Sequence, residues 1–464
     1  MISLKRLISG FIVFTLLFTV TACSNSQNTA SNTKNDTTNT STDTKQNKAI
    51  EITYWHAMGG ALGEAVNKMV DNFNKTHPNI KVTAQFQGNY DEELNKLRTA
   101  QQSKSGPDIV QVYDIGTRFM VDSGWAVPIQ KFIDAEKYDI SKLEPNLLAY
   151  YTVDKELYSM PFNSSTPILY YNKTAFKDAG LDPNTPPKNF DEIEQFSKKL
   201  IKKDSSGKVT QYGYSMAIYG WFFEQFMAKQ GALYANNGNG RDKRATAVVF
   251  NDEAGQNIIN WWRKLVDEGL AGNFGRSYDD TVNAFTAGRT AMFIASTASL
   301  KQVLDGVGNK FEVGTGFLPA LNNNKDGGVI IGGASLWVLN TRSEEYQNAA
   351  WEFIKYMVSP EQQLFWHQNT GYFPVTKAVY EMPEMKIHLE KYPQFNTAIE
   401  QLHKTPINRA TQGALIGVFP EARQTVEKAI EKVLQKQAEP MQALDEAVKS
   451  INSALENYNQ TIGK

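Results

Sequence analysis

Residues 50–86, which read IEITYWHAMGGALGEAVNKMVDNFNKTHPNIKVTAQF, contain the pattern that decides the fold of this chain. Residues 50–55 alternate like a strand. Apolar side chains then recur at the spacing of one helix face, at Leu62, Val66, Met69, Val70 and Phe73. A strand at 80–86, a helix carrying Leu94 and Leu97, and a strand at 108–113 are expected next. This alternation of strand and helix predicts a parallel α/β layer.

The rhythm breaks at 160–167, which reads MPFNSSTP and precedes the strand-like ILYY at 168–171. Two prolines around small polar residues suit a segment that crosses between two lobes. Helices are expected again at 253–268 and 279–287, so the second half has α/β content of its own. Near the C-terminus, an apolar stripe predicts a helix packed against a domain surface, through Met441, Leu444, Val448, Ile451 and Leu455.

The N-terminus has the features of an exported, lipid-anchored protein. Lys5 and Arg6 precede an apolar run that ends near Val20, shorter than the roughly 20 residues a membrane-spanning helix needs. Residues 1–23 are therefore predicted to be a signal peptide, with a permanent span as the weaker alternative. Residues 20–23, VTAC, resemble a bacterial lipobox, and Cys23, the only cysteine, is the expected lipid attachment point. The polar stretch 24–48 is expected to be a flexible tether.

Composition and motifs argue against several classes of protein. The chain has 48 basic and 49 acidic residues, so it has no field to attract nucleic acid or an anionic membrane. The 5 histidines are scattered, and the glycine pairs do not continue into a nucleotide-binding loop, so we expect neither metal nor cofactor. No local motif marks a catalytic centre, and we expect no enzyme. A secreted hydrolase stays open, because glycosidase carboxylates can lie far apart in sequence.

Eight short motifs follow one another along the chain, at 54–60 (YWHAMGG), 88–90 (GNY), 111–114 (QVYD), 161–167 (PFNSSTP), 295–296 (AS), 331–337 (IGGASLW), 366–372 (WHQNTGY) and 413–423 (GALIGVFPEAR). In this order they resemble the glycerol-3-phosphate-binding proteins of ABC importers, from about residue 50 to the C-terminus. The resemblance implies a two-lobed α/β fold of the periplasmic-binding-protein type II, with lobes that close on a ligand about a hinge. Lobe 1 is expected to contain 49–163 and about 325–373, and lobe 2 about 164–324 and 374–464.

The same resemblance implies which residues bind the ligand. On the phosphate side it places Ser165, Ser296, Gly333 and Arg423. Arg423 is the expected phosphate anchor, because a guanidinium can make two parallel charge-assisted bonds. On the glycerol side it places Tyr90, Asp114 and Tyr372.

Two positions depart from the family pattern. Asp114 stands where the family has glutamate, and Ile218 where it has a ligand-facing tryptophan, although Trp221 is retained and Tyr219 offers partial compensation. We therefore expect a protein anchored through Cys23 on the extracellular face of the cell membrane. It would pass glycerol-3-phosphate, or glycerophosphodiesters, to the permease subunits of an ABC importer. An oligosaccharide-binding protein of the same fold is the alternative.

Overall fold

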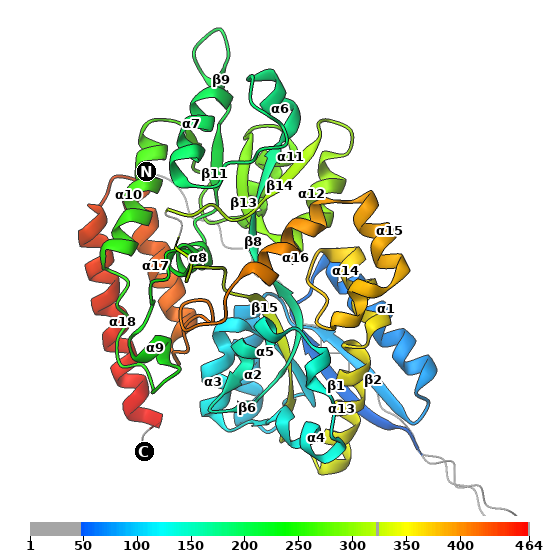
Figure 1. The fold of residues 1–464 in the computed structure, drawn as a ribbon. Helices are drawn as coiled ribbons and strands as arrows, with labels where there is room; N and C mark the ends of the chain where they lie inside the picture. The colour runs from blue at the N-terminus through cyan, green and yellow to red at the C-terminus, as the bar shows by residue number, and fades with distance from the viewer. Residues whose placement is uncertain (1–47, 322–323, 463–464) are drawn as a thin grey trace, which may run out of the picture. The chain divides into compact units, whose positions relative to one another are not determined.

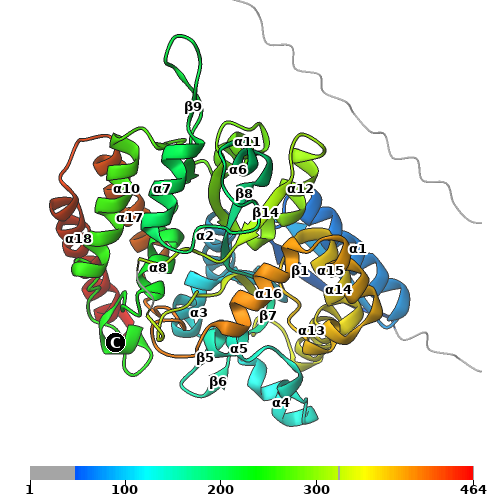
Figure 2. The same cartoon turned by 45° about the horizontal axis from the view of Figure 1, so that its top comes forward.

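The computed structural model describes residues 48–321 and 324–462. The predicted signal peptide, Cys23 and nearly all of the predicted tether lie outside the described residues. Residues 48–464 form one unit, whose strands and helices are shown in two views (Figures 1 and 2).

One sheet has six strands in the order β2-β1-β3-β15-β4, with β7 also paired to β15. Their bounds are β1 Ile50–His56, β2 Ile80–Phe86, β3 Ile109–Tyr113, β4 Ala126–Val127, β7 Met160–Ser165 and β15 Gly332–Leu339. The strands predicted at 50–55, 80–86 and 108–113 are confirmed, and β1 is parallel to both β2 and β3. By contrast, β15 pairs antiparallel with β3. The parallel layer predicted from the alternation at 50–113 is therefore confirmed, while the antiparallel β15 makes the sheet as a whole mixed.

A second sheet has five strands in the order β12-β11-β13-β8-β14. Their bounds are β8 Pro167–Asn172, β11 Tyr214–Met216, β12 Ala271–Gly272, β13 Met292–Ser296 and β14 Val313–Gly316. The chain passes from the first sheet to the second between β7 and β8, which are separated by the buried Thr166. The segment predicted to cross between lobes lies at this point, and most of it is strand. The full residue bounds of the two lobes stay a prediction.

Helices surround both sheets, and two short hairpins, β5 with β6 and β9 with β10, extend from them. The hairpin strands are β5 Thr152–Val153, β6 Glu156–Leu157, β9 Lys202–Lys203 and β10 Val209–Gln211. The helices are α1 Gly60–Thr76, α2 Tyr90–Gln102, α3 Thr117–Ser123, α4 Ile129–Glu136, α5 Pro145–Tyr151, α6 Lys173–Asp178, α7 Phe190–Leu200, α8 Gly220–Lys229, α9 Asn236–Gly240, α10 Glu253–Asp267, α11 Tyr278–Thr286, α12 Leu300–Val307, α13 Glu344–Met357, α14 Pro360–Thr370, α15 Pro383–Lys391, α16 Gln394–Lys404, α17 Phe419–Leu434 and α18 Pro440–Ile462.

The C-terminal helix α18 has the predicted apolar stripe. Of the predicted residues it buries Leu444, Ile451 and Leu455, together with Ala443 and Ala447, whereas Met441 and Val448 are half-buried. In both views it lies beside α17 and α10, and all three helices are in contact (Figures 1 and 2). The predicted packing of this helix on a domain surface is confirmed.

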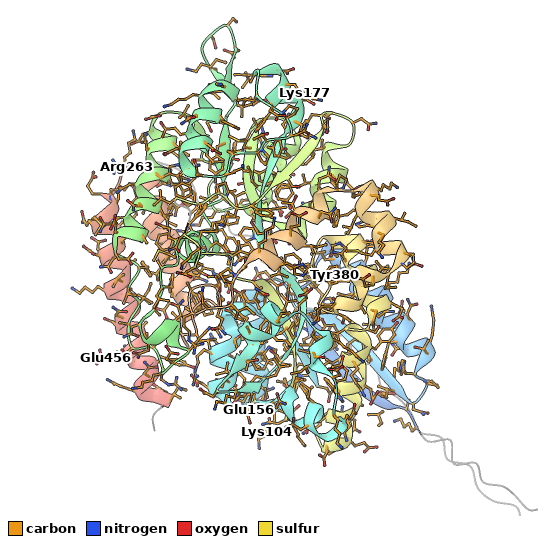
Figure 3. All side chains as sticks on the ribbon, viewed as in Figure 1. Lys104, Glu156, Lys177, Arg263, Tyr380 and Glu456 are labelled. Carbon is orange, nitrogen blue, oxygen red and sulfur yellow. The ribbon has the colours of Figure 1, made fainter. Side chains whose placement is uncertain are left out.

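Charged side chains of both signs project from the surface, as Figure 3 shows for Lys104, Lys177, Glu156 and Glu456. Ion pairs between exposed charged side chains contribute only about 0–1 kcal/mol each to stability. No helix in the described part of the chain is both long enough and apolar enough to span a bilayer. A few charged side chains are instead buried, and they lie next to the largest group of predicted site residues.

Candidate ligand-binding site

A cavity of about 460 Å³ lies where the ends of β3, β7 and β13 and the start of β15 meet the first residue of α2. Of the seven residues predicted to bind ligand, six line it: Tyr90, Asp114, Ser165, Ser296, Gly333 and Tyr372. They come from both sheets, since Ser165 ends a strand of the six-stranded sheet and Ser296 ends a strand of the five-stranded sheet. The fold thus brings together side chains that are up to 282 positions apart, from Tyr90 to Tyr372.

The position of Tyr90 is set by the two residues before it in the motif GNY, Gly88 and Asn89. Asn89 caps α2, accepting a hydrogen bond from the Glu92 N–H at 3.0 Å, while the Glu92 carboxylate accepts one from the Asn89 N–H at 2.9 Å. Gly88 has φ +95°, and a Cβ there would lie 2.0 Å from a Glu92 carboxylate oxygen. The left-handed backbone favours glycine before the cap, and any side chain there would also displace the Glu92 carboxylate from the cap. The Tyr90 ring, held at the helix start, stacks on Tyr113 with ring centroids 5.2 Å apart.

Ser165 and Gly333 lie on paired strands. Ser165 at the end of β7 faces Gly332, and Gly333 faces Ser164. Gly333 has φ +93°, and a Cβ there would lie 1.8 Å from the carbonyl oxygen of Asn163. The absence of a side chain is what lets these two strands pair beside the cavity.

Ser296 combines a cap with its place in the cavity wall. Its Oγ accepts a hydrogen bond from the Ala298 N–H at 3.1 Å, which leaves its own proton available as a donor. Its backbone N–H donates to the Tyr278 hydroxyl at 2.7 Å, and that hydroxyl is 2.8 Å from Ser299 Oγ. On this side of the wall the Tyr278 and Ser299 hydroxyls are thus linked to each other, and Tyr278 also holds the backbone of Ser296.

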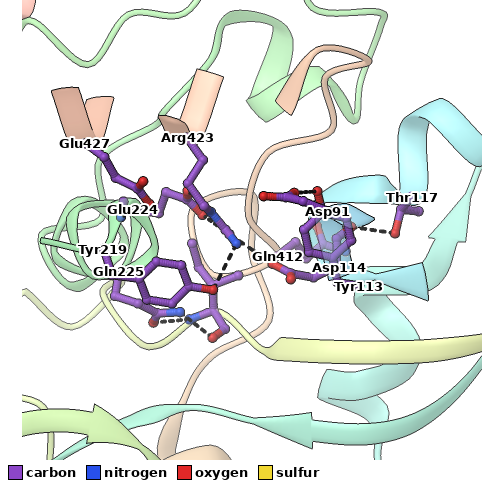
Figure 4. Close-up of polar contacts among 12 residues, drawn as sticks. Asp91, Tyr113, Asp114, Thr117, Tyr219, Glu224, Gln225, Gln412, Arg423 and Glu427 are labelled. Carbon is purple, nitrogen blue, oxygen red and sulfur yellow. Dashed lines mark hydrogen bonds and ion pairs between the residues drawn. The ribbon is translucent and has the colours of Figure 1, made fainter. Parts of the chain in front are cut away.

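Arg423 does not line this cavity. It borders an adjacent cavity of about 150 Å³, and it is only 4% exposed. Its Nε and Nη2 both donate to the Glu224 carboxylate at 2.8 Å, as Figure 4 shows. Nη2 also donates to Asp114 at 3.2 Å, and Nη1 donates to the Tyr219 hydroxyl at 3.4 Å. The paired bonds that the sequence analysis assigned to phosphate are made to Glu224 in this structure.

The buried ion cluster has one cation and two anions. Burial raises the pKa of the Asp114 carboxyl and raises that of Glu224 to about 7, against the pull of the nearby guanidinium. Burial opposes the charge on Arg423, but Glu224 and Asp114 outweigh it and hold the Arg423 pKa well above its ordinary value. The guanidinium is therefore charged at neutral pH, while Glu224 is poised to take up a proton.

The cavity wall also contains residues that were not predicted from the sequence to bind ligand: Leu62, Tyr113, Arg276, Tyr278, Asp279, Ala298, Ser299 and Gln302. Arg276 is a second cation. Its Nη2 donates to Glu431 at 2.6 Å, and its Nε is buried without a partner among the described residues. The only local signal for it is the stretch GRSY at 275–278, which leads from the loop after the short strand β12 into α11, and loops commonly face a ligand.

The two departures from the family pattern have structural counterparts. Ile218 is buried and does not belong to the wall, whereas the retained Trp221 and Tyr219, which was expected to compensate in part, both line the cavity. A Cβ at Gly332 would lie 2.6 Å from the Trp221 ring, so the indole rests directly on β15. Across the described residues, no group of three or more His, Cys, Asp or Glu side chains converges as a metal site requires.

Two sheets with helices around them, and a cavity of this size lined from both, define a protein that can enclose a small solute. The family model of the bacterial extracellular solute-binding proteins matches residues 68–397, so the chain belongs to this family. It is 36% identical over 420 residues to the sn-glycerol-3-phosphate-binding periplasmic protein UgpB of Pectobacterium atrosepticum, which covers 89% of this chain and 93% of that protein. It is 35% identical over 417 residues to UgpB of Escherichia coli, covering 88% and 93%.

Solved structures share the fold. UgpB from Mycobacterium tuberculosis in complex with glycerophosphocholine superposes with a TM-score of 0.75 at 22% identity, covering 88% of this chain and 99% of that one. The cyclic α-maltosyl-1,6-maltose binding protein from Arthrobacter globiformis gives a TM-score of 0.71 at 23% identity, covering 88% and 100%. The predicted two-lobed fold is confirmed.

Proposed function

We propose that this protein captures sn-glycerol-3-phosphate, or a glycerophosphodiester, outside the cell and delivers it unchanged to the permease subunits of an ABC importer. The observation that carries the proposal is the gathering of six motif-derived residues around one cavity. The relatives named for sn-glycerol-3-phosphate, at 35–37% identity over most of the chain, support the same ligand. A volume of about 460 Å³ is in the range of small-molecule sites.

Phosphate recognition at this site combines neutral donors with two cations. Ser165, Ser296 and the backbone amide of Gly333 would donate hydrogen bonds to phosphate oxygens. Arg276 already lies in the wall. Arg423 would engage the phosphate by exchanging its bonds to Glu224 for bonds to the ligand. Because burial raises the Glu224 pKa to about 7 even with Arg423 beside it, the released carboxyl would take up a proton readily at neutral pH.

The second candidate ligand is an oligosaccharide. The aromatic rings of Tyr90, Tyr113 and Trp221 in the wall, together with the carboxylates of Asp114 and Asp279, are groups that suit sugars as well. The sugar-binding structure of the same fold adds to this reading.

Isothermal titration calorimetry separates the two candidates. We expect purified protein to bind sn-glycerol-3-phosphate at one site per chain, and to show no heat of binding with maltose or maltotriose. Recovering the ligand unchanged after long incubation would agree with a binding protein, whereas release of inorganic phosphate would indicate an enzyme. Saturable binding of the maltose series, without binding of sn-glycerol-3-phosphate, would overturn the proposed ligand.

We also propose that Cys23 carries a lipid that anchors the protein to the cell membrane. Replacing Cys23 with serine should release or mislocalise the protein without changing the affinity of the purified body for its ligand, because the cavity lies in residues 62–372. Cell fractionation and labelling with a fatty acid test this. Wild-type protein that is cleaved at the same leader but incorporates no fatty acid would contradict the anchor.

A further inference from the structure

A chain of three hydrogen bonds, the middle one buried and the outer two partly buried, leads from the backbone after β1 to the Tyr90 hydroxyl. The Ala57 N–H donates to Gln111 Oε1 at 2.9 Å, Gln111 Nε2 donates to Asn163 Oδ1 at 2.7 Å, and Asn163 Nδ2 donates to the Tyr90 hydroxyl at 2.8 Å. Gln111 and Asn163 are both 0% exposed. We call the side chains of Gln111 and Asn163 the amide relay.

The direction of this relay is fixed by its first bond. A backbone N–H can only donate, so the Gln111 side chain must turn its oxygen toward Ala57 and its NH₂ group toward Asn163. Asn163 then faces Gln111 with its oxygen, which leaves its NH₂ group for Tyr90. No water at these fully buried positions is needed to complete the chain. The Tyr90 oxygen is therefore an acceptor toward Asn163, and its proton points away from Asn163.

Tyr372 lies beside Tyr90 in the same wall. Burial raises the pKa of the Tyr372 hydroxyl, while hydrogen bonds from Asn163 and Tyr90 act in the opposite direction. The Tyr372 oxygen is thus an acceptor on the relay side, and the Tyr372 proton is left for the cavity.

We propose that Gln111 and Asn163 are positioning residues that turn the Tyr90 proton away from the relay, toward Tyr372 and the cavity, so that this wall recognises an oxygen acceptor of the ligand. The inference rests on the proposed function only in naming that acceptor, a hydroxyl, ester or phosphate oxygen of a glycerol phosphate. A ligand group that can only donate, such as an ammonium, is disfavoured at this position. Asn163 and Gln111 do not line the cavity, so their effect is exerted through Tyr90.

Two variants reverse the relay without changing its size. Asn163→Asp at pH 8 places a carboxylate, which can only accept, beside Tyr90. In Gln111→Glu, the new carboxylate accepts hydrogen bonds from the Ala57 N–H and from the Asn163 NH₂ group. The Asn163 amide is therefore turned over, and its oxygen faces Tyr90. In each variant the Tyr90 hydroxyl must donate its proton to the oxygen at position 163. We expect each to weaken sn-glycerol-3-phosphate binding about tenfold, the usual size of one hydrogen bond.

A double-mutant cycle with Tyr90→Phe separates positioning from general disruption. Once the hydroxyl is absent, Asn163→Asp should weaken binding less than twofold further. A Coulomb penalty on an anionic ligand, or a loosened fold, would persist in the Tyr90→Phe background. A full tenfold loss in that background would overturn the inference.

Carbon-13 spectra of ligand-free protein labelled at tyrosine Cζ provide a test that does not depend on the ligand. The Tyr90 resonance, assigned by its absence in Tyr90→Phe protein, should shift in Asn163→Asp and in Gln111→Glu. It should stay in place in Gln225→Glu, which adds a carboxyl to a buried glutamine bonded instead to Ile330. An unmoved Tyr90 resonance in both relay variants would overturn the inference, whereas failure of wild-type protein to bind sn-glycerol-3-phosphate would contradict the proposed ligand alone.

Discussion

Arg423→Ala protein should bind sn-glycerol-3-phosphate roughly 30-fold to several thousand-fold more weakly than wild-type protein. Removing one partner of a buried charge-assisted pair costs on the order of 2–5 kcal/mol, and a phosphate needs a cation that a neutral sugar does not. The net charge of the chain is -1, so the compensation must be local. Arg423→Lys should recover only part of the affinity, because an ammonium keeps the charge and loses the planar pair of bonds. Calorimetry measures both variants.

The buried cluster makes a stability control essential. Arg423→Ala leaves the carboxylates of Glu224 and Asp114 without their cation, and breaking such a buried pair destabilises a protein by about 3–5 kcal/mol. The matched comparison is therefore Arg423→Ala in a Glu224→Gln background, with folding checked by circular dichroism and thermal melting. Folded double-variant protein with near-normal affinity for sn-glycerol-3-phosphate would remove Arg423 from phosphate binding. Arg276→Ala, measured alongside, shows whether the cation in the cavity wall has that role instead.

The parts of the fold that periodicity predicted are those whose order is local. Residues 50–113 alternate strand and helix, and β1, α1, β2 and β3 lie within a few residues of the predicted positions. The place of β15 is not local, because Trp337 pairs with Val110 across more than 200 positions. No pattern within 332–339 records which strand it joins or in which direction.

The candidate site divides in the same way. The motifs identified six residues that share one cavity, because each motif is a short backbone arrangement, such as the cap at Asn89, that places its own side chain. Arg423 was predicted from its motif alone, and its bonds to Glu224 depend on a contact across 199 positions. Arg276 was missed because a single arginine after a two-residue strand has no signature of its own.

Gly333→Ala should lower the free energy of unfolding by about 3 kcal/mol or more, and this is the largest stability effect we expect from adding a single methyl group in the cavity wall. A left-handed backbone costs a non-glycine residue about 1–2 kcal/mol, and overpacking adds about 1–3 kcal/mol. The new Cβ would stand 1.8 Å from the Asn163 carbonyl oxygen, which is backbone and cannot rotate away. Denaturant unfolding of the variant against wild-type protein measures the loss.

Gly269→Ala is the matched control for this prediction. Gly269 has φ +68°, and a Cβ there would meet nothing within 4 Å, so only the conformational cost of about 1–2 kcal/mol should appear. The difference between the two variants isolates the collision with Asn163. Because Asn163 also orients Tyr90, Gly333→Ala protein that still folds should bind ligand more weakly, whereas Gly269→Ala should bind normally. Equal losses of stability in the two variants would show that β7 yields to the methyl group and that Gly333 is needed for its backbone conformation alone.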